Sequence, residues 1–116
     1  LGYISLLRTL ASFYLCGGDS VSQKDALILK KDGETVTFEC SYSTTERHYY
    51  LFWYRHYPGK QPEFILRRDS YYNQERIGEG IGIRFSSRLL TSQSATRLSI
   101  FELLVSDSAV YLCALS

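Results

Sequence analysis

Apolar and polar residues alternate with a period of two in several short stretches of the chain. Residues 34–40 read ETVTFEC, in which Val36, Phe38 and Cys40 share one face and Thr and Glu occupy the other. This alternation is typical of a β-strand with one buried face. Five further stretches also read as strands, namely 51–56, 63–67, 83–86, 96–100 and 109–113. No stretch after residue 18 has a convincing helical period, so the pattern predicts an all-β domain.

Turn residues separate these predicted strands. Asp32 and Gly33 precede the first strand. Residues 57–60 read YPGK, with Pro58 and Gly59 at the positions that a type II turn favours. Short strands with turn signals about every ten residues favour an antiparallel sandwich or a small barrel.

The first 18 residues differ from the rest of the chain. They are apolar, and Arg8 is their only charged residue. The apolar tract at 9–16 has the length of a signal-peptide core and is far short of the roughly 20 residues that span a bilayer. We therefore expect residues 1–18 to be a signal peptide, truncated because it lacks an initiating Met. A buried N-terminal helix is the alternative.

Small residues end this tract at the positions that cleavage requires. Cys16 and Gly18 occupy the −3 and −1 positions of a cut before Asp19, where a polar run begins. Residues 19–116 would then form the mature protein, which has room for one domain.

The cysteine count depends on that cut. The chain has three Cys, and losing Cys16 leaves Cys40 and Cys113 as one pair. A secreted route and an even number of cysteines predict a disulfide. Metal binding is the competing interpretation, but Cys40, His48, His56 and Cys113 lack any CxxC or HxxxH spacing. We expect no metal and no cofactor.

Composition narrows the classes of partner. The formal net charge is +1, which gives no reason to expect nucleic acid or another polyanion. Apolar residues make up 45% and charged residues 22%, which excludes a disordered chain. Aromatics reach 15%, with ten Tyr and no Met. This usage favours a rigid amphipathic binding surface.

Catalytic motifs are missing from the sequence. No GxSxG or HExxH spacing organises its Ser, His and Asp residues. The glycine cluster at 78–82 lacks the Lys of a phosphate-binding loop and does not lead from a strand into a helix. We expect a protein that is not an enzyme and has no small-molecule substrate.

The spacing of a few residues specifies the fold further. Cys40, Trp53 and Cys113 all fall on inward faces of their predicted strands, at separations of 13 and 60 residues. A disulfide between two sheets with a Trp packed on it is typical of immunoglobulin domains. Tyr111 stands two residues before Cys113, the position of the tyrosine corner in that fold. The distance from Trp53 to Cys113 leaves room for the extra strand pair of the variable type.

Two segments resemble T-cell receptor alpha or delta variable segments. Residues 107–115 read DSAVYLCAL and residues 53–60 read WYRHYPGK. The resemblance implies an immunoglobulin V-set domain over residues 19–116, serving antigen recognition in adaptive immunity. It also implies pairing with a beta or gamma variable domain and binding of peptide–MHC or an MHC-like ligand. The route would lead through the secretory pathway to the outer side of the plasma membrane, with anchoring through a constant region.

The resemblance also assigns structural residues. Family members pair an Arg at the start of one strand with the Asp before the tyrosine corner, which here implies an ion pair between Arg84 and Asp107. An ordinary exposed pair, worth under about 1 kcal/mol, is the alternative. The implied core residues are Trp53, Tyr111 and Leu98.

One outward face would contact the partner domain. Its implied residues are Tyr54, His56, Pro62, Phe64 and Leu112. An outward face this apolar indicates a covered surface. His56 departs from the family, whose members usually place Gln there to hydrogen-bond its counterpart. Imidazole can donate or accept but adds pH sensitivity.

The loops at one end of the sandwich would bind antigen. Their implied contact residues are Arg47, His48, Tyr49, Tyr50, Tyr71, Tyr72, Asn73, Leu115 and Ser116. The chain stops three residues after Cys113, with no joining strand. We expect a germline-like segment whose sandwich lacks its last strand.

Two other functions stay open at this point. One is a standalone V-set ectodomain of an innate or adhesion receptor. The other is an antibody light-chain variable segment, disfavoured by the YPG turn at 57–59 and by CAL at 113–115. A β-rich secreted enzyme has no residues to support it.

Overall fold

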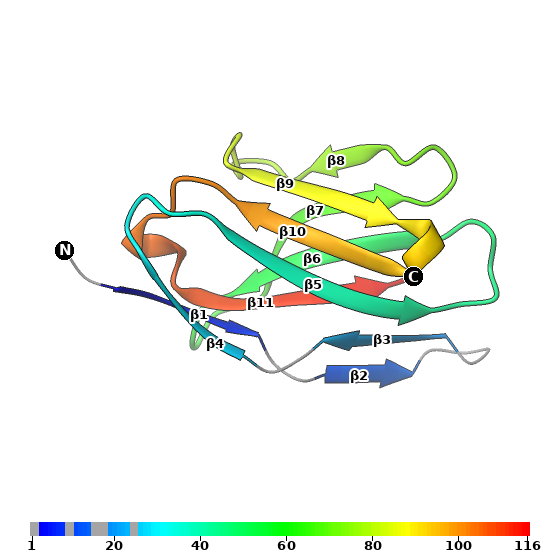
Figure 1. The fold of residues 1–116 in the computed structure, drawn as a ribbon, viewed down its shortest axis with the longest axis horizontal. Coiled ribbons are helices and arrows are strands. Elements are labelled where there is room, and N and C mark those ends of the chain that lie inside the picture. The colour runs from blue at the N-terminus through cyan, green and yellow to red at the C-terminus, as the bar shows by residue number, and fades with distance from the viewer. Residues whose placement is uncertain (1–2, 9–10, 15–18, 24–25) are drawn as a thin grey trace.

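The protein is a β-sandwich in the computed structural model, which describes residues 3–8, 11–14, 19–23 and 26–116. Figure 1 shows its strands, and the described residues also include the short 3-10 helices η2 (Thr91–Gln93) and η3 (Val105–Asp107). The first sheet has the spatial order β4 (Ala26–Lys31), β1 (Tyr3–Arg8), β11 (Ala109–Leu115), β6 (Tyr50–His56), β7 (Glu63–Asp69) and β8 (Glu75–Ile77). The second has the order β2 (Ala11–Tyr14), β3 (Ser20–Gln23), β5 (Val36–Ser43), β10 (Ala95–Ile100) and β9 (Phe85–Leu90). In the described ranges no helix has the length and apolar character needed to cross a membrane.

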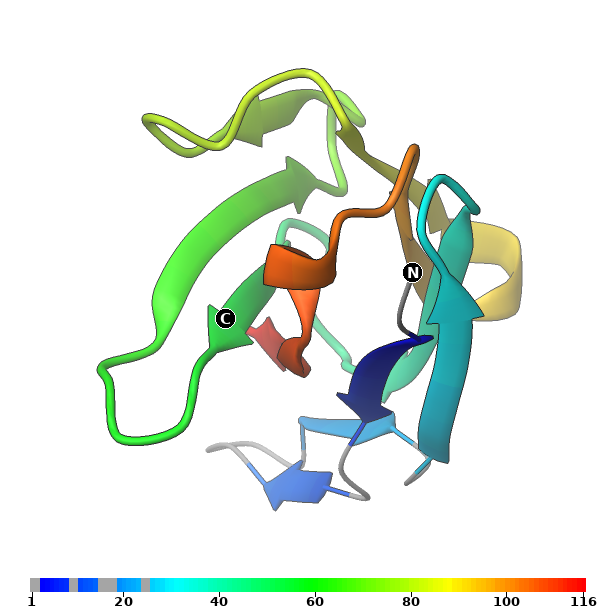
Figure 2. The same ribbon diagram turned by 90° about the vertical axis from the view of Figure 1, so that its left-hand side faces the viewer.

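The two sheets face each other as layers. Figure 2 looks at them end-on, with β6 and β7 on one side and β9 and β10 on the other. Burial alternates strictly along β5 and β11, so every second side chain enters the space between the layers. The all-β, variable-type sandwich predicted from the sequence is confirmed.

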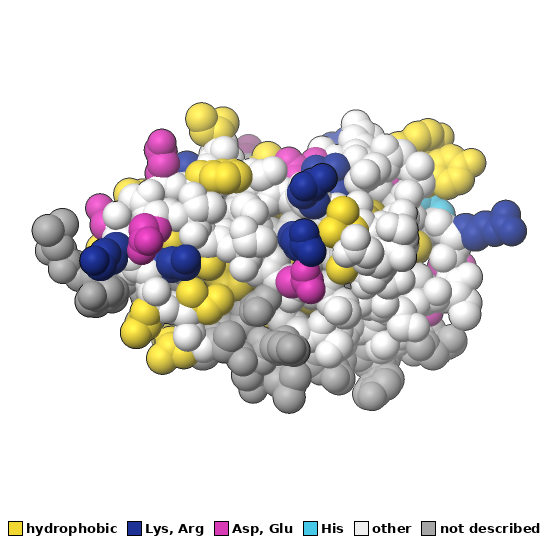
Figure 3. Space-filling view, in the orientation of Figure 1, with side chains coloured by type: hydrophobic (Ala, Val, Ile, Leu, Met, Phe, Trp, Pro, Cys, Tyr) yellow, Lys and Arg dark blue, Asp and Glu magenta, His cyan; other side chains and the backbone are white. Residues whose placement is uncertain are grey.

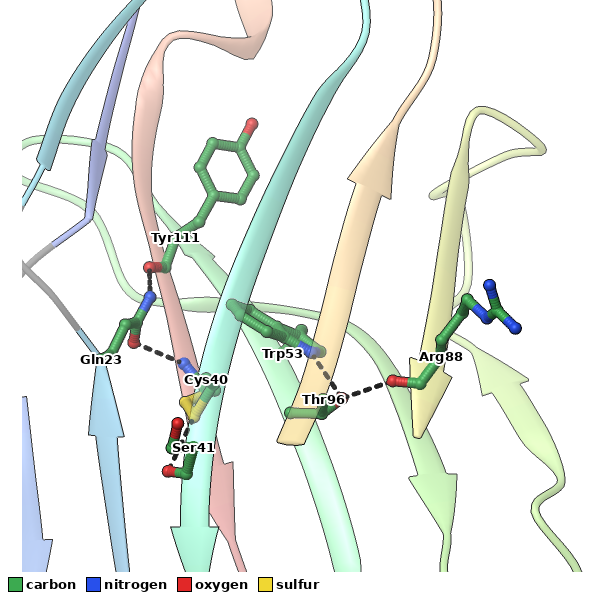
Figure 4. Close-up of a disulfide and its surroundings, with 8 residues drawn as sticks. Gln23, Cys40, Ser41, Trp53, Arg88, Thr96 and Tyr111 are labelled. Atoms are coloured by element: carbon green, nitrogen blue, oxygen red, sulfur yellow. Dashed lines mark hydrogen bonds between the residues drawn. A yellow bond between two sulfur atoms is a disulfide. The ribbon is translucent and has the colours of Figure 1, made fainter. Parts of the chain in front are cut away.

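A disulfide between Cys40 and Cys113 crosses the core from β5 to β11 (Figure 4), with Cα atoms 6.5 Å apart. The predicted disulfide is therefore present. Trp53 is fully buried beside it, and its Nε1 donates to Thr96 Oγ1 at 3.3 Å. A buried indole N–H needs such a partner, because an unsatisfied donor would destabilise the core. Leu98, the third predicted core residue besides Trp53 and Tyr111, is also fully buried.

Tyr111 and Asp107 form the corner that leads into β11. The Tyr111 hydroxyl donates to the backbone oxygen of Asp107 at 2.6 Å, and its ring stacks on Phe38. Arg84 donates to both carboxylate oxygens of Asp107, at 2.8 and 3.0 Å. Asp107 is 1% exposed, so this pair is not the ordinary exposed ion pair that the sequence left as the alternative.

Gln23 is a core residue that the sequence analysis missed. Its side chain is 2% exposed and joins β3 to β11 (Figure 4). Nε2 donates to the backbone oxygen of Tyr111 at 2.7 Å, and Oε1 accepts from the Cys113 N–H at 3.1 Å. Both polar ends of a buried amide are thereby satisfied.

The boundaries of all six predicted strands differ from the observed ones by one to four residues, and two of these differences matter for the site. The strand expected at 83–86 begins at Phe85 and continues to Leu90, while Ile83 is 97% exposed. The reason is Gly82, whose φ of +84° turns the chain before the strand begins. The last strand continues past Cys113 to Leu115. Strands β3, β4 and β8 had no clear sequence signal.

The N-terminal segment lies against the sandwich. The described residues 3–8 and 11–14 are β-strands, so the alternative of a buried helix is wrong there. β1 runs parallel to β11, with Leu6 opposite Ala109 and Leu7 opposite Val110. β1 therefore occupies the edge of β11, where we expected no neighbouring strand because the chain has no joining strand. Cys16 and Gly18, the −3 and −1 residues of the predicted cut before Asp19, lie outside the described residues, and the signal peptide stays a prediction.

Candidate functional site

Three segments that are distant in sequence meet at one end of the sandwich. They are residues 44–49, residues 70–74 and Ser116, and we call them the loop surface. Tyr49 N–H donates to Ser70 Oγ at 2.9 Å, and Ser70 N–H donates back to the Tyr49 oxygen at 3.0 Å. Ser116 exchanges two backbone hydrogen bonds with Tyr50, at 3.1 and 3.2 Å. The first two segments are thus bonded directly to each other, and Ser116 is bonded to Tyr50, which follows the first segment.

Asp69 is the polar centre of this end. It is 8% exposed and accepts hydrogen bonds from the N–H groups of Tyr71 at 3.0 Å and Tyr72 at 2.9 Å. His48 Nε2 lies 2.7 Å from Asp69 Oδ1, which joins the first loop to the second. Burial alone would raise the pKa of this carboxyl. The two backbone hydrogen bonds and His48 outweigh burial and lower the pKa, so Asp69 is held ionised.

Aromatic rings surround His48. Its ring centroid lies 5.3 Å from that of Tyr50 and 5.6 Å from that of Tyr71. Tyr71 and Tyr72 meet edge to face and are 68% and 75% exposed. At the right-hand end of Figure 3, hydrophobic and basic side chains lie close together. Exposed Tyr rings on loops that are held by hydrogen bonds provide contact area at a low cost in conformational entropy.

The prediction that Tyr49 and Leu115 are exposed contact residues is wrong. Tyr49 is 9% exposed, and its hydroxyl is 2.6 Å from that of Tyr42 inside the core. Leu115 is 5% exposed, because it faces inward as the last residue of β11. Both side chains are buried in the core beneath the loop surface and do not form part of it. The other predicted loop residues are at least partly exposed, namely Arg47, His48, Tyr50, Tyr71, Tyr72, Asn73 and Ser116.

Arg68 supports the second loop in a way the sequence did not reveal. Its Nη1 donates to the backbone oxygen of Asn73 at 2.7 Å, and its Nη2 donates to Glu75 at 3.0 Å and to the Ser87 oxygen at 2.9 Å. Asn73 has a φ of +54°, a turn conformation that Asn tolerates better than most residues. This network joins β7, β8 and β9 beneath the loop surface.

The outward side of the first sheet carries a row of aromatic rings, which we call the aromatic face. It comprises Tyr50, Phe52, Tyr54 and Phe64, with neighbouring ring centroids 6.0 to 6.3 Å apart. Leu112 lies opposite Tyr54 on the adjacent strand. All of these side chains are partly exposed. Phe52 was not predicted as part of this face, although its period-two relation to Tyr54 was a usable signal.

An apolar groove of about 390 Å³ lies beside the aromatic face. Tyr54, Pro62 and Leu112 line it, together with Val21 and Ala114. The other two predicted face residues lie on the same sheet, Phe64 in β7 and His56 at the end of β6 opposite Val110.

No metal centre accompanies these surfaces in the residues that the structure describes. They contain no cluster of three or more His, Cys, Asp or Glu side chains that could hold an ion. The described side chains of the two surfaces can offer a ligand packing and hydrogen bonding.

Comparison with known proteins gives one consistent result. The Immunoglobulin V-set domain family matches residues 23–116. T cell receptor alpha variable 38-1 of Homo sapiens is 34% identical over 95 residues, covering 82% of this chain and 78% of that relative. T cell receptor alpha variable 9-1 of Homo sapiens is 36% identical over 110 residues, covering 92% and 93%. The Immunoglobulin iota chain of Mus musculus is 34% identical over 111 residues, covering 94% and 78%.

Proposed function

Because the chain belongs to the immunoglobulin V-set family and is an antigen-receptor variable domain, we propose that it forms half of a T-cell receptor heterodimer. In that role its aromatic face packs against a beta or gamma variable domain, and its loop surface binds peptide–MHC or an MHC-like ligand. The domain is not an enzyme. We further propose that residues 1–18 direct it into the secretory pathway and that a constant region anchors it at the plasma membrane.

The aromatic face is the observation that carries this proposal. Partly exposed rings and an apolar groove lie together on one sheet, at Tyr54, Phe64 and Leu112. A contiguous outward surface of this kind is typical of a protein interface, where aromatic residues are enriched. The face adjoins the loop surface through Tyr50, so a paired domain would extend the ligand-binding end.

The loop surface supports ligand recognition for a separate reason. Its two loops are joined by hydrogen bonds at Asp69 and Ser70, so they are ordered before a ligand arrives. Preorganised loops with exposed Tyr side chains are typical of antigen-binding surfaces.

Pairing can be tested with one charge on the aromatic face. Tyr54→Asp would bury a carboxylate without a partner at the interface, and we expect it to weaken pairing with a beta or gamma variable domain by several kcal/mol, roughly 100-fold or more. The measurement is heterodimer yield and dissociation constant after coexpression with a panel of such domains.

Ser41→Asp is the matched control, because Ser41 is exposed on the outward side of the other sheet. It should pair as the unaltered chain does. If Tyr54→Asp pairs equally well, the aromatic face is not the interface. A folded chain that pairs with no variable domain would instead favour the standalone receptor.

A further inference from the structure

Two arginines face each other beside the loop surface. Arg67 on β7 and Arg76 on β8 are directly opposed in the antiparallel register, and both line a pocket of about 220 Å³. Directly opposed residues share one face of a sheet, with Cβ atoms about 5 Å apart. Like charges so placed repel each other, so an anion between them would remove an electrostatic cost.

Neither guanidinium is paired with a carboxylate in the described ranges of the chain. The neighbouring Glu75 is bonded to Arg68 and to Ser87 instead. Asp69 lies at the pocket wall, but both of its oxygens already accept the hydrogen bonds described above. Two guanidinium groups and one carboxylate therefore line the pocket, and among the described residues neither guanidinium lies within ion-pairing distance of a carboxylate.

A ring in the pocket wall contacts the first of these donors. The guanidinium carbon of Arg67 lies 4.8 Å from the centre of the Tyr50 ring. A guanidinium held over a ring can still donate its N–H groups, in the planar fork that matches a carboxylate. Tyr72 forms another wall and offers an apolar surface to the methylene groups of an incoming side chain.

We propose that this pocket binds the carboxylate of a Glu or Asp side chain from the protein ligand of the receptor, with Arg67 and Arg76 as donors. The inference rests on the proposed function, because the pocket borders the loop surface. A carboxylate is the anion that protein side chains supply, and its two coplanar oxygens match the planar fork of a guanidinium. The pocket thus selects for an acidic position on the ligand.

The test uses the full chain labelled with nitrogen-15 and follows the Nε–Hε signals of its arginines by NMR. The probes are a capped alanine–glutamate–alanine tripeptide, its glutamine counterpart and inorganic phosphate. We expect saturable shifts at Arg67 and Arg76 with the glutamate peptide and at least tenfold weaker binding of the glutamine peptide. Each charge-assisted hydrogen bond lost accounts for about tenfold.

Substitutions identify the donors. Arg76→Gln should weaken the glutamate peptide at least tenfold, and Arg76→Lys should restore part of the affinity because it returns the charge without the fork. Arg88→Gln is the matched control, since Arg88 is exposed on β9 and lies outside the pocket. It should bind the peptide unchanged.

Three results would overturn the inference. They are equal binding of both peptides, equal shifts at Arg88, and tighter binding of phosphate than of the glutamate peptide. None of these measurements involves a partner domain. A chain that pairs but ignores the glutamate peptide disproves only the pocket, whereas a chain that binds the peptide but never pairs disproves only the heterodimer.

Discussion

Asp107 shows how one buried carboxylate can fix the conformation of a whole corner. It accepts hydrogen bonds from Arg84 and from the Leu104 N–H, while its backbone oxygen accepts from Tyr111. Burial by itself would raise the pKa of this carboxyl. The hydrogen bonds from Arg84 and Leu104, with the charges of Arg84 and Arg55, outweigh burial and lower the pKa. The ionised form is therefore part of the folded structure.

Asp107→Asn should lower the free energy of unfolding at pH 7 by about 1–3 kcal/mol, because a neutral amide cannot replace a carboxylate bonded to two donors. A carboxyl whose pKa is lowered by folding stabilises the protein above the pKa of the unfolded chain, about 3.9. That contribution is lost as the pH falls below about 4 and then through the lower pKa that Asp107 has in the folded protein. The difference between the two proteins should therefore shrink between pH 4 and pH 2. Urea unfolding across this range measures it.

Glu63→Gln is the control for this comparison, because the Glu63 side chain is 47% exposed in its pair with Arg55. Its effect should stay under about 1 kcal/mol. A loss of stability by Asp107→Asn that is the same at pH 7 and pH 3 would contradict an ionised Asp107.

Residues whose role follows from spacing could be predicted, and residues whose partners are distant could not. The alternation of apolar and polar residues and the spacing along the chain predicted the roles of Trp53 and the two cysteines. The motif of the resembled family predicted the pair of Arg84 and Asp107. Gln23 stands in a polar run that carries no periodic signal, and its partners are 88 and 90 residues away. In the sequence, Tyr49 is indistinguishable from an exposed loop Tyr, and only the structure shows its hydroxyl bonded to that of Tyr42. Arg67 and Arg76 gain their meaning only from the strand register.

At the scale of elements, the pairing of β1 with β11 was not predicted from the sequence. β1 covers β11 at Ala109 and Val110 and is itself paired along its length with β4. An exposed strand edge invites pairing with other chains. If residues 1–18 are removed as a signal peptide, β1 leaves with them, and this edge loses its cover.

A chain starting at Asp19 should therefore be less soluble and less stable than the same chain carrying an added joining strand. The comparison needs three proteins: residues 1–116, residues 19–116, and residues 19–116 with the joining strand. Size-exclusion profiles should show larger assemblies for the second, and its thermal midpoint should be the lowest. If residues 19–116 are monomeric and as stable as the extended chain, the edge of β11 is protected in another way.

At the scale of the molecule, a disulfide joins the two layers within the part of the chain that the structure describes. The bond between Cys40 and Cys113 closes a loop between residues 73 positions apart. The core around it is contiguous, with Phe38, Trp53 and Leu98 fully buried. A small domain of this kind depends on the bond because its core alone is limited.

Replacing both cysteines, Cys40→Ala with Cys113→Ala, should lower the free energy of unfolding by about 4 kcal/mol in the chain-entropy model. Denaturant unfolding of the oxidised and doubly substituted proteins measures the difference. Thiol titration of the unreduced chain from Asp19 should find no reactive thiol. Two reactive thiols in the folded protein would show that the bond does not form in solution.

The hydrogen bonds that join His48 to Asp69 and Tyr49 to Ser70 also affect when conformational freedom is lost. Immobilising a side chain during association costs about 0.5–1.5 kcal/mol. Here the ordering of the first two loops is completed as the domain folds, before any encounter. Their contribution to binding should accordingly carry a small entropic penalty and little rearrangement, so these loops would meet different ligands with one shape. Adaptation to each ligand would then have to come from the ligand itself or from other segments of the receptor.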